Sequence, residues 1–172
     1  MERWSDPKQL MVWAERTRRV ASFISTDQTV MDLGCGQMTL RDAIPKGCTY
    51  IPADLVKRSD DCRQIELNEG LWPQETADVV VALGVLEYVY DIKGFFYGCA
   101  RIAPRLIFSY HISYSRNYAT RVERMKMGWL NDFPISQVVT EIVRAGGKIE
   151  RIDGFMHKQN FTQYLFVVVF PT

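Results

Sequence analysis

Two acidic residues and a glycine pair have the types and spacing needed to hold a nucleotide-like ligand. Asp32 lies in an apolar run that reads as a buried strand, and Gly34 and Gly36 break that run, with Cys35 between them. Glycines tolerate positive φ and carry no side chain, so the backbone can approach a ligand closely at such a turn. Asp54 ends a second apolar stretch, where its oxygens could accept hydrogen bonds from adjacent ribose hydroxyls or simply cap a turn.

A second set of side chains could move a proton. His111 is the first candidate for a general base, because its unperturbed pKa is about 6.5 and it is the histidine expected at the ligand edge of the sheet. The alternative for His111 is a loop residue that makes an ordinary hydrogen bond. Tyr88 is a weaker candidate, together with Glu87 and Tyr110, and His157 is expected to lie far from the ligand.

Alternating strands and helices must position these side chains. Runs typical of strands are found at 29–33, 49–53, 63–67, 77–83, 105–110, 148–155 and 162–170. Apolar residues at three- and four-residue steps predict helices at 7–24, 91–103 and 134–145, with a short helix at 37–44 and an irregular segment at 113–131. This order predicts an α/β fold: a doubly wound, seven-stranded, mostly parallel sheet with helices on both faces and a C-terminal antiparallel hairpin.

The predicted topology brings the candidate residues to one edge of the sheet. In open sheets of this kind, ligands bind outside the carboxyl ends of the strands, where the strand order reverses. Asp32, Asp54 and Gly84 follow three of the parallel strands, and the fifth strand is expected to deliver His111 at its end. A loop that contains Asn160 is expected to join the strands of the closing hairpin.

Three motifs occur in a recognisable order: DLGCG at 32–36, the Ala53-Asp54 pair, and ADVVVALGVLEYV at 77–89. At these motifs the chain resembles the class I S-adenosylmethionine (SAM)-dependent methyltransferases. The motifs are similar to that family's first motif, its ribose-binding acidic position and its fourth-strand motif. The closing hairpin is similar to the family's sixth and seventh strands, so the resemblance extends from about Thr29 to the end of the sequence and implies a Rossmann-like methyltransferase fold.

The resemblance implies SAM-dependent methyl transfer, with S-adenosylhomocysteine as the product of the cofactor. It implies that Asp32 and the backbone around Gly34 hold the methionine portion, that Asp54 holds the ribose hydroxyls and that Leu55 flanks the adenine. The full set of cofactor residues it implies is Asp32, Gly34, Cys35, Gly36, Asp54, Leu55, Leu67, Leu83 and Gly84.

The resemblance also assigns the remaining walls of the cofactor site. Leu67, with Glu66 or Asn68, would lie against the adenine edge, while Leu83 and Gly84 would line the sulfonium. No metal is implied, since the fourth strand lacks the terminal carboxylate that catechol-type enzymes use to bind magnesium.

One position departs from the family pattern, and one rival ligand can be weighed against SAM. Met38 occupies the place where the family often has a third glycine, so it either narrows the methionine end of the cofactor site or packs under the helix.

A nicotinamide dinucleotide is disfavoured because the GxGxxG fingerprint needs glycine where Thr39 stands, and because Asp32 suits an ammonium better than a pyrophosphate. A non-catalytic SAM-binding or scaffold subunit on the same fold stays open as an alternative.

The acceptor is less constrained than the cofactor. Neither the (D/N/S)PP(Y/F/W) tetrapeptide associated with amino-group methylation of bases and glutamine nor a Pro-Cys pair for attack on a pyrimidine ring is present. We therefore expect a small-molecule or carrier-linked acceptor that is modified at oxygen, nitrogen or carbon.

Basic residues gather in two segments. Arg16, Arg18 and Arg19 in the first predicted helix are expected to form a solvated face rather than an anion site. The segment 113–131, which is expected to cover the acceptor, contains Arg116, Arg121, Arg124 and Lys126. These four side chains could receive an anionic acceptor or form a solvated surface, and the sequence leaves both readings open.

Composition sets outer limits on the function. The length of 172 residues is that of one ordinary domain, so a single domain, 1–172, is expected. No apolar run of about 18 residues and no signal-type N-terminus occurs, so a cytoplasmic protein is expected. A net charge of +1 argues against DNA as a partner. Four cysteines without a CxxC pair, together with two histidines, give no zinc or iron-sulfur ligand pattern. A monomer or a homodimer is expected.

Overall fold

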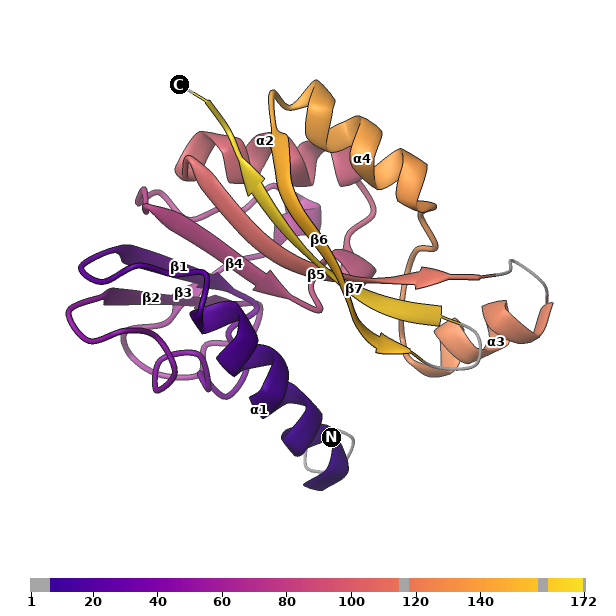
Figure 1. Ribbon diagram of the computed structural model, residues 1–172, viewed down its shortest axis with the longest axis horizontal. Coiled ribbons are helices and arrows are strands. Elements are labelled where there is room, and N and C mark those ends of the chain that lie inside the picture. The colour runs from indigo at the N-terminus through magenta and orange to yellow at the C-terminus, as the bar shows by residue number, and fades with distance from the viewer. Residues whose placement is uncertain (1–6, 115–117, 158–160, 172) are drawn as a thin grey trace.

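A seven-stranded sheet runs through the computed structural model, which describes residues 7–114, 118–157 and 161–171 (Figure 1). The strand order is β3-β2-β1-β4-β5-β7-β6. The strands are β1 (Thr29–Leu33), β2 (Thr49–Asp54), β3 (Arg63–Gln64), β4 (Val79–Leu83), β5 (Arg105–Ser113), β6 (Lys148–His157) and β7 (Phe161–Val169). The helices are α1 (Pro7–Ala21), α2 (Ile92–Ile102), α3 (Tyr118–Lys126) and α4 (Ile135–Arg144), with short 3-10 turns η2 (Leu67–Glu69) and η3 (Leu86–Tyr88).

The strand order reverses between β1 and β4. β1 pairs in parallel with β2 on one side and with β4 on the other, and β4 pairs in parallel with β5. β7 is antiparallel to both β5 and β6. The predicted α/β fold with a mostly parallel sheet and a C-terminal antiparallel hairpin is therefore confirmed, and the residues after β1 and β4 lie at the reversal point where open sheets bind ligands.

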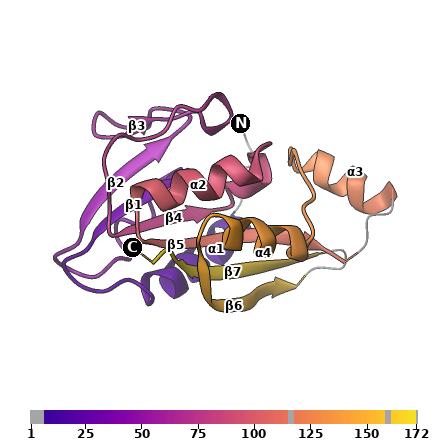
Figure 2. The same ribbon diagram turned by 90° about the horizontal axis from the view of Figure 1, so that it is seen from above.

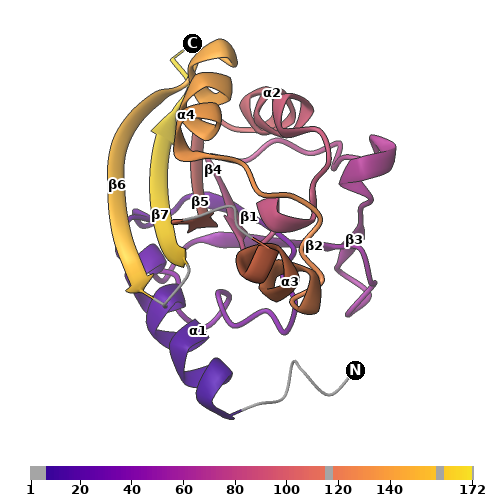
Figure 3. The same ribbon diagram turned by 90° about the vertical axis from the view of Figure 1, so that its right-hand side faces the viewer.

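Two apolar clusters fill the two faces of the sheet. One contains Phe95 and Phe96 of α2 and Ile142 of α4, packed on strand residues such as Phe108 and Phe166. The rings of Phe108 and Phe166 stack with centroids 4.6 Å apart. The other cluster contains Val20 of α1 and the opposite faces of the central strands. Figures 2 and 3 show α2 and α4 together on one side of the sheet and α1 on the other side.

The local sequence explains why these elements form. β4 is a run of β-branched and small residues, VVVAL, of which the first four are fully buried, as expected for a strand covered on both faces. α2 begins where the Asp91 side chain accepts a hydrogen bond from the Gly94 amide at 3.0 Å, an N-cap that satisfies one free amide of the first turn. α4 ends ahead of the Gly146-Gly147 pair.

Four predictions about elements were wrong. Residues 37–44 form turns rather than a short helix, because eight residues before a proline cannot stabilise a helix without strong packing. The segment 113–131, predicted as irregular, contains α3. β5 continues to Ser113, so His111 lies inside the strand rather than after it. β6 likewise continues to His157, and the predicted loop residue Asn160 lies outside the described residues.

Among the described residues, none of the helices is both long enough and apolar enough to cross a membrane.

Candidate functional site

The turn after β1 is held close to β2 by two backbone hydrogen bonds, and both of its glycines have positive φ values. Gly34 and Gly36 have φ values of 71° and 51°, which favour glycine. The amides of Gly34 and Cys35 both donate to the Ala53 carbonyl, at 2.7 and 3.1 Å. A Cβ atom on Gly34 would lie 2.5 Å from the side chain of Val85, so any larger residue would collide with the loop after β4.

Met38 adopts the backbone conformation that a glycine would adopt. Its φ is 58°, in the left-handed region, which costs a non-glycine residue about 1 kcal/mol. Its sulfur lies 3.9 Å from the Ser59 hydroxyl in the loop after β2. The departure from the family pattern therefore keeps the turn geometry, and the side chain is directed toward the loop that follows β2.

Asp54 is engaged by the turn itself. Its two carboxylate oxygens accept hydrogen bonds from the Gly36 amide at 2.8 Å and the Val56 amide at 3.0 Å, and Arg58 lies 3.9 Å away. Asp54 therefore caps the turn. A carboxylate has about four acceptor sites, so Asp54 can still accept hydrogen bonds from two ribose hydroxyls. Leu55, next in the chain, is exposed beside it.

Asp32 is a buried acid at the end of β1. The Tyr50 hydroxyl donates a hydrogen bond of 2.6 Å to it from β2. Burial raises the pKa of Asp32 to about 7, although the Tyr50 hydrogen bond and the positive charge of Arg16 act in the opposite direction. Asp32 therefore ionises readily only when a cation is close.

Arg16 of α1 supplies that charge, and sequence reasoning missed it. Its Nη1 lies 3.6 Å from the position that a Cβ on Gly84 would take. Burial lowers the pKa of Arg16 to about 10, opposed by the charges of Glu87 and Asp32. Its Nε is buried and makes no hydrogen bond within the part of the chain that the structure describes.

The expectation of a solvated arginine face was wrong for Arg16. Arg18 is exposed as expected, and Arg19 pairs with Asp153 at 3.1 Å. A signal was available, because Arg16 lies one helical turn before the fully buried Val20 and therefore on the same face of α1.

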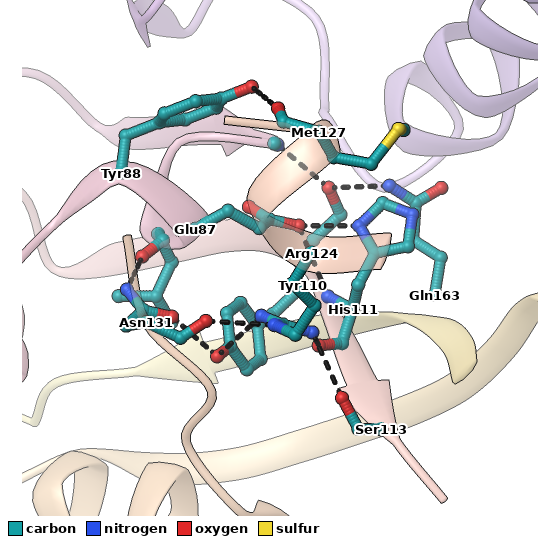
Figure 4. Close-up of polar contacts among 12 residues, drawn as sticks. Glu87, Tyr88, Tyr110, His111, Ser113, Arg124, Met127, Asn131 and Gln163 are labelled. Atoms are coloured by element: carbon teal, nitrogen blue, oxygen red, sulfur yellow. Dashed lines mark hydrogen bonds and ion pairs between the residues drawn. The ribbon is translucent and has the colours of Figure 1, made fainter. Parts of the chain in front are cut away.

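The loop after β4 brings Glu87 against His111. Oε1 of Glu87 lies 2.6 Å from His111 Nδ1 and accepts a hydrogen bond of 3.1 Å from the His111 backbone amide (Figure 4). Glu87 is fully buried, and its Oε2 has no hydrogen-bond partner among the described residues. The Tyr88 hydroxyl donates to the Met127 carbonyl at 3.5 Å, so it faces the segment after α3.

The candidate base is also tied to the end of β4. The Gly84 amide donates to the Ser109 hydroxyl at 2.9 Å, and Gln163 of β7 donates to the same oxygen at 3.3 Å. Ser109 and His111 lie two residues apart on one face of β5. Gly84, which was expected to line the sulfonium, is therefore bonded to the face of β5 that also carries His111.

The segment after β5 folds over His111 and is anchored by Arg124. Arg124 donates to the carbonyls of His111 and Asn131 at 3.0 and 2.8 Å and to the Tyr110 hydroxyl at 3.2 Å (Figure 4). It also lies 4.7 Å from the Trp129 ring, which stacks on His111 at 4.5 Å. Neither alternative left open for Arg124, an anion site or a solvated surface, describes it, because its guanidinium is buried and bound internally.

Two of the other basic residues of that segment lie on the protein surface. Arg121 and Lys126 are exposed on α3, and Arg116 lies outside the described residues.

The residues expected at the adenine edge and beside the sulfonium make different contacts in the structure. Asn68 donates to the Tyr88 carbonyl at 2.9 Å and accepts from the Tyr90 amide at 3.0 Å, so its side chain joins two loops. Leu67 starts η2, where Glu66 accepts from the Asn68 amide at 3.2 Å. Leu83 is the last residue of β4 and is partly buried.

His157 lies on β6, the outermost strand and far in the sheet order from β1 and β4, as expected of a residue remote from the site. Across residues 7–114, 118–157 and 161–171, no three His, Cys, Asp or Glu side chains are grouped in a way that could hold a metal ion.

Comparisons with known proteins match the fold rather than the sequence. No protein-family model matches the chain, and no curated protein matches it. Among solved structures, a methyltransferase described as putative from Bacillus halodurans C-125 matches with a TM-score of 0.73 at 10% identity, over 92% of this chain and 99% of that chain. Magnesium protoporphyrin IX methyltransferase from Synechocystis PCC 6803, with bound S-adenosylhomocysteine, matches with a TM-score of 0.67 at 14% identity, over 94% of this chain and 84% of that chain.

A third match is longer than this chain. The pyocyanin biosynthetic protein PhzM matches with a TM-score of 0.66 at 14% identity over 90% of this chain, which spans 54% of PhzM. The strand order, the antiparallel β7 and these structural matches show that the chain has the fold of the class I SAM-dependent methyltransferases.

Proposed function

We propose that this protein is a SAM-dependent methyltransferase that acts on a small-molecule or carrier-linked acceptor, with residues 1–172 working as one domain. The observation that supports it most strongly is a set of buried charges left without full pairing. Arg16 Nε and Glu87 Oε2 lack hydrogen-bond partners in the described part of the chain, and Asp32 is buried beside them. Buried charges are costly unless paired, so this arrangement fits a ligand that carries charges of both signs.

SAM fits that requirement group by group. Its carboxylate would pair with Arg16, and its ammonium would be held near Asp32. At Gly36, next to Gly34 in the turn, a Cβ would have only the Gly34 carbonyl oxygen nearby at 4.0 Å, so the backbone there allows close approach to the methionine portion, and Gly84 leaves room beside Arg16 because it has no side chain. Asp54 keeps acceptor capacity for the ribose hydroxyls, and exposed Leu55 offers an apolar surface for the adenine.

A bound SAM would supply an electrophilic methyl group on a sulfonium. The protein's part would be to hold the acceptor in line with that methyl group, to exclude water and to take up a proton. The segment of α3 and Trp129 covers the face of His111, which serves the first two tasks. His111 is our candidate for the proton, and Tyr88, whose hydroxyl faces the same segment, borders the acceptor.

The Synechocystis relative with bound S-adenosylhomocysteine supports the choice of cofactor, since it shares the fold.

Calorimetric titration with SAM, S-adenosylhomocysteine and NADH tests the cofactor. We expect both sulfur compounds to bind and NADH not to bind. Asp54→Asn should weaken SAM binding by about tenfold, the loss of one hydrogen bond from a charged group. Asp60→Asn, an exposed carboxylate in the same loop, should leave SAM binding unchanged. Absence of SAM binding at millimolar concentration would refute the proposal.

The reaction is tested with methyl-labelled SAM and pooled metabolite extracts. Transfer of label to an extract component supports an enzyme. SAM binding without transfer to any extract would instead assign the chain as a non-catalytic SAM-binding or scaffold subunit.

A further inference from the structure

The Asp32 carboxylate is held from the neighbouring strand by one hydroxyl group. Tyr50 of β2 donates to Oδ2 of Asp32 at 2.6 Å. β1 and β2 are parallel, and Asp32 lies opposite Pro52 in their register. Tyr50 lies two residues before Pro52 and therefore on the same face of the sheet, so its ring runs along β2 and brings the hydroxyl to the end of β1.

The hydrogen bond leaves one oxygen of Asp32 for a ligand. It is the hydrogen bond that the described residues make to this carboxylate, and it engages Oδ2. An ionised carboxylate oxygen accepts about two hydrogen bonds, so Oδ1 keeps its full capacity. Asp32 comes directly before the turn of Gly34 and Gly36, where the methionine portion of the cofactor is proposed to lie. Oδ1 is thus the oxygen that an ammonium group would meet.

The Tyr50 ring is itself held in place on its solvent side. The guanidinium carbon of Arg41 lies 5.0 Å from the centre of the ring, and Arg41 pairs with Asp61 at 2.7 Å. A cation over an aromatic face is attracted to it, which restrains the half-buried ring. Burial and the charge of Asp32 raise the pKa of Tyr50, so its hydroxyl keeps its proton and acts as a donor.

Titratable groups face Asp32 from α1, from β2 and from its own turn. Burial raises the pKa of Asp32 to about 7, and the negative charge of Asp54 acts in the same direction. The Tyr50 hydrogen bond lowers this pKa, and the positive charge of Arg16 lowers it less. The Cys35 thiol in the turn stays neutral, because burial raises its pKa. Tyr50 is therefore the strongest of the groups that favour the ionised form of Asp32.

We propose that Tyr50 is a positioning residue of the cofactor site, whose hydroxyl holds Oδ2 of Asp32 so that Oδ1 receives the ammonium of the methionine portion. The proposal rests on the proposed function and deepens it. Tyr50 acts through Asp32 and needs no contact with the ligand. A hydrogen bond to a carboxylate favours its charged form, so Tyr50 also sets the pH above which Asp32 receives a cation.

The pH dependence of ligand binding in Tyr50→Phe tests the proposal. The probe is S-adenosylhomocysteine, which carries an ammonium and has no reactive methyl group. Calorimetric titration between pH 6 and pH 8.5 gives the midpoint at which its affinity rises. We expect Tyr50→Phe to move this midpoint upward by about one to two pH units, the range for losing a hydrogen bond to a charged group. At pH 7 the affinity should then fall by about fivefold to fiftyfold.

A second ligand and a second tyrosine separate positioning from support of the fold. 5′-Methylthioadenosine lacks the amino-acid portion, so Tyr50→Phe should bind it as well as the unmodified protein does. Tyr97→Phe is the matched control, because the Tyr97 hydroxyl donates to the Arg144 carbonyl at 2.9 Å on the α2 side of the sheet. It should keep the midpoint for S-adenosylhomocysteine. An equal loss of affinity for both ligands in Tyr50→Phe would make Tyr50 a support of the fold and overturn the proposal.

Replacement of Tyr50 by 3-fluorotyrosine tests the same hydrogen bond in the opposite direction, even if Tyr50→Phe does not fold. The fluorinated ring keeps the hydroxyl and makes it a stronger donor, so the midpoint should fall. A midpoint that is absent from the unmodified protein, that stays in place in Tyr50→Phe or that fails to fall with 3-fluorotyrosine would overturn the proposal while the proposed function stands. If S-adenosylhomocysteine does not bind to the unmodified protein, the proposed function itself fails.

Discussion

At the scale of single residues, the proposed site contains buried acids and an arginine whose charges act on one another. Asp32 is the most sensitive of them to pH, because burial raises its pKa to about 7 although the positive charge of Arg16 acts in the opposite direction. A ligand with an ammonium should bind to the ionised form of Asp32.

SAM affinity should therefore fall as pH falls through about 7. Between pH 8 and pH 6 the ionised fraction of an acid with a pKa of about 7 falls about tenfold, and the dissociation constant of SAM should rise by the same factor. Calorimetry across this range measures it. Asp32→Asn should bind SAM weakly with a flat pH profile, whereas Asp78→Asn, at the other end of the neighbouring strand, should keep the profile. A flat profile in the unmodified protein would contradict the role of Asp32.

The same residue should make the protein less stable at high pH. The folded pKa of Asp32 is raised above its ordinary value of 3.8, so its contribution to stability is present at low pH and is lost as pH rises toward 7. Between pH 5 and pH 8 the loss should be about 2–3 kcal/mol of unfolding free energy. Asp32→Asn, which keeps an oxygen for the Tyr50 hydroxyl, should remove this loss. Urea unfolding at both pH values measures the difference, and parallel pH dependence in the two proteins would contradict it.

Arg16 is predicted to be a direct ligand of the cofactor carboxylate. Arg16→Met keeps the aliphatic stem but removes the charge, and SAM affinity should fall by about tenfold to hundredfold, the range for losing a charge-assisted hydrogen bond. Arg18→Met on the exposed face of the same helix is the matched control and should bind SAM normally. Equal affinities for the two variants would remove Arg16 from the site.

At the scale of elements, α3 and Trp129 are held to the sheet by one buried side chain. Arg124 joins the His111 and Asn131 carbonyls and the Tyr110 hydroxyl, and Asn131 in turn donates to the carbonyls of Leu86 and Val89 at 2.6 and 2.7 Å. The segment proposed to cover the acceptor is thus fastened to the strand that carries His111 and to the loop that carries Glu87.

Arg124→Met should loosen this segment without disrupting the sheet. It leaves several buried acceptors unpaired, so the free energy of unfolding should fall by about 3 kcal/mol. Hydrogen exchange should rise first in 118–131, where the Leu130 amide donates to the Glu87 carbonyl at 2.8 Å. Arg121→Met on the exposed face of α3 should change neither quantity. Uniform exchange across the whole chain in Arg124→Met would show that the residue supports the core rather than the segment.

At the scale of the whole molecule, the residues proposed to hold the cofactor come from both sides of the reversal point in the sheet. α1 supplies Arg16, β1 and β2 supply Asp32 and Asp54, and the loop after β4 supplies Gly84 and Glu87. A ligand that contacts all of them would hold α1 and two halves of the sheet together.

SAM should therefore raise the thermal midpoint of the whole protein. At 100 times its dissociation constant, a ligand adds about 2.7 kcal/mol of stability, which corresponds to about 5–10 °C for a chain of this size. Differential scanning calorimetry measures the shift. NADH at the same concentration should produce no shift, and a larger shift with NADH than with SAM would reverse the choice of cofactor.

Much of the fold was already determined by the sequence. The β-branched run of β4, the apolar stripe of α2 and the glycine turn after β1 predict their structures because burial and backbone sterics act locally. The DLGCG motif, Asp54 and Gly84 also fall where expected in the sheet, since the carboxyl ends of parallel strands share one edge. The predicted helix at 37–44 failed because a segment of that length depends on packing that the sequence does not display.

Only the tertiary structure decided which charges meet. Arg16 lies far along the chain from Asp32 and Glu87, and its burial follows from how α1 packs on the sheet rather than from its neighbours in sequence. Arg124 seemed available to an anion, yet its side chain is bound to three partners from β5 and the segment after α3. The sequence by itself determined the sheet and its glycine turn, because these depend on local apolar patterns and backbone conformation. The pairing of Glu87 with His111 and the charge balance of the site depend on distances between separate elements, which only the folded structure sets.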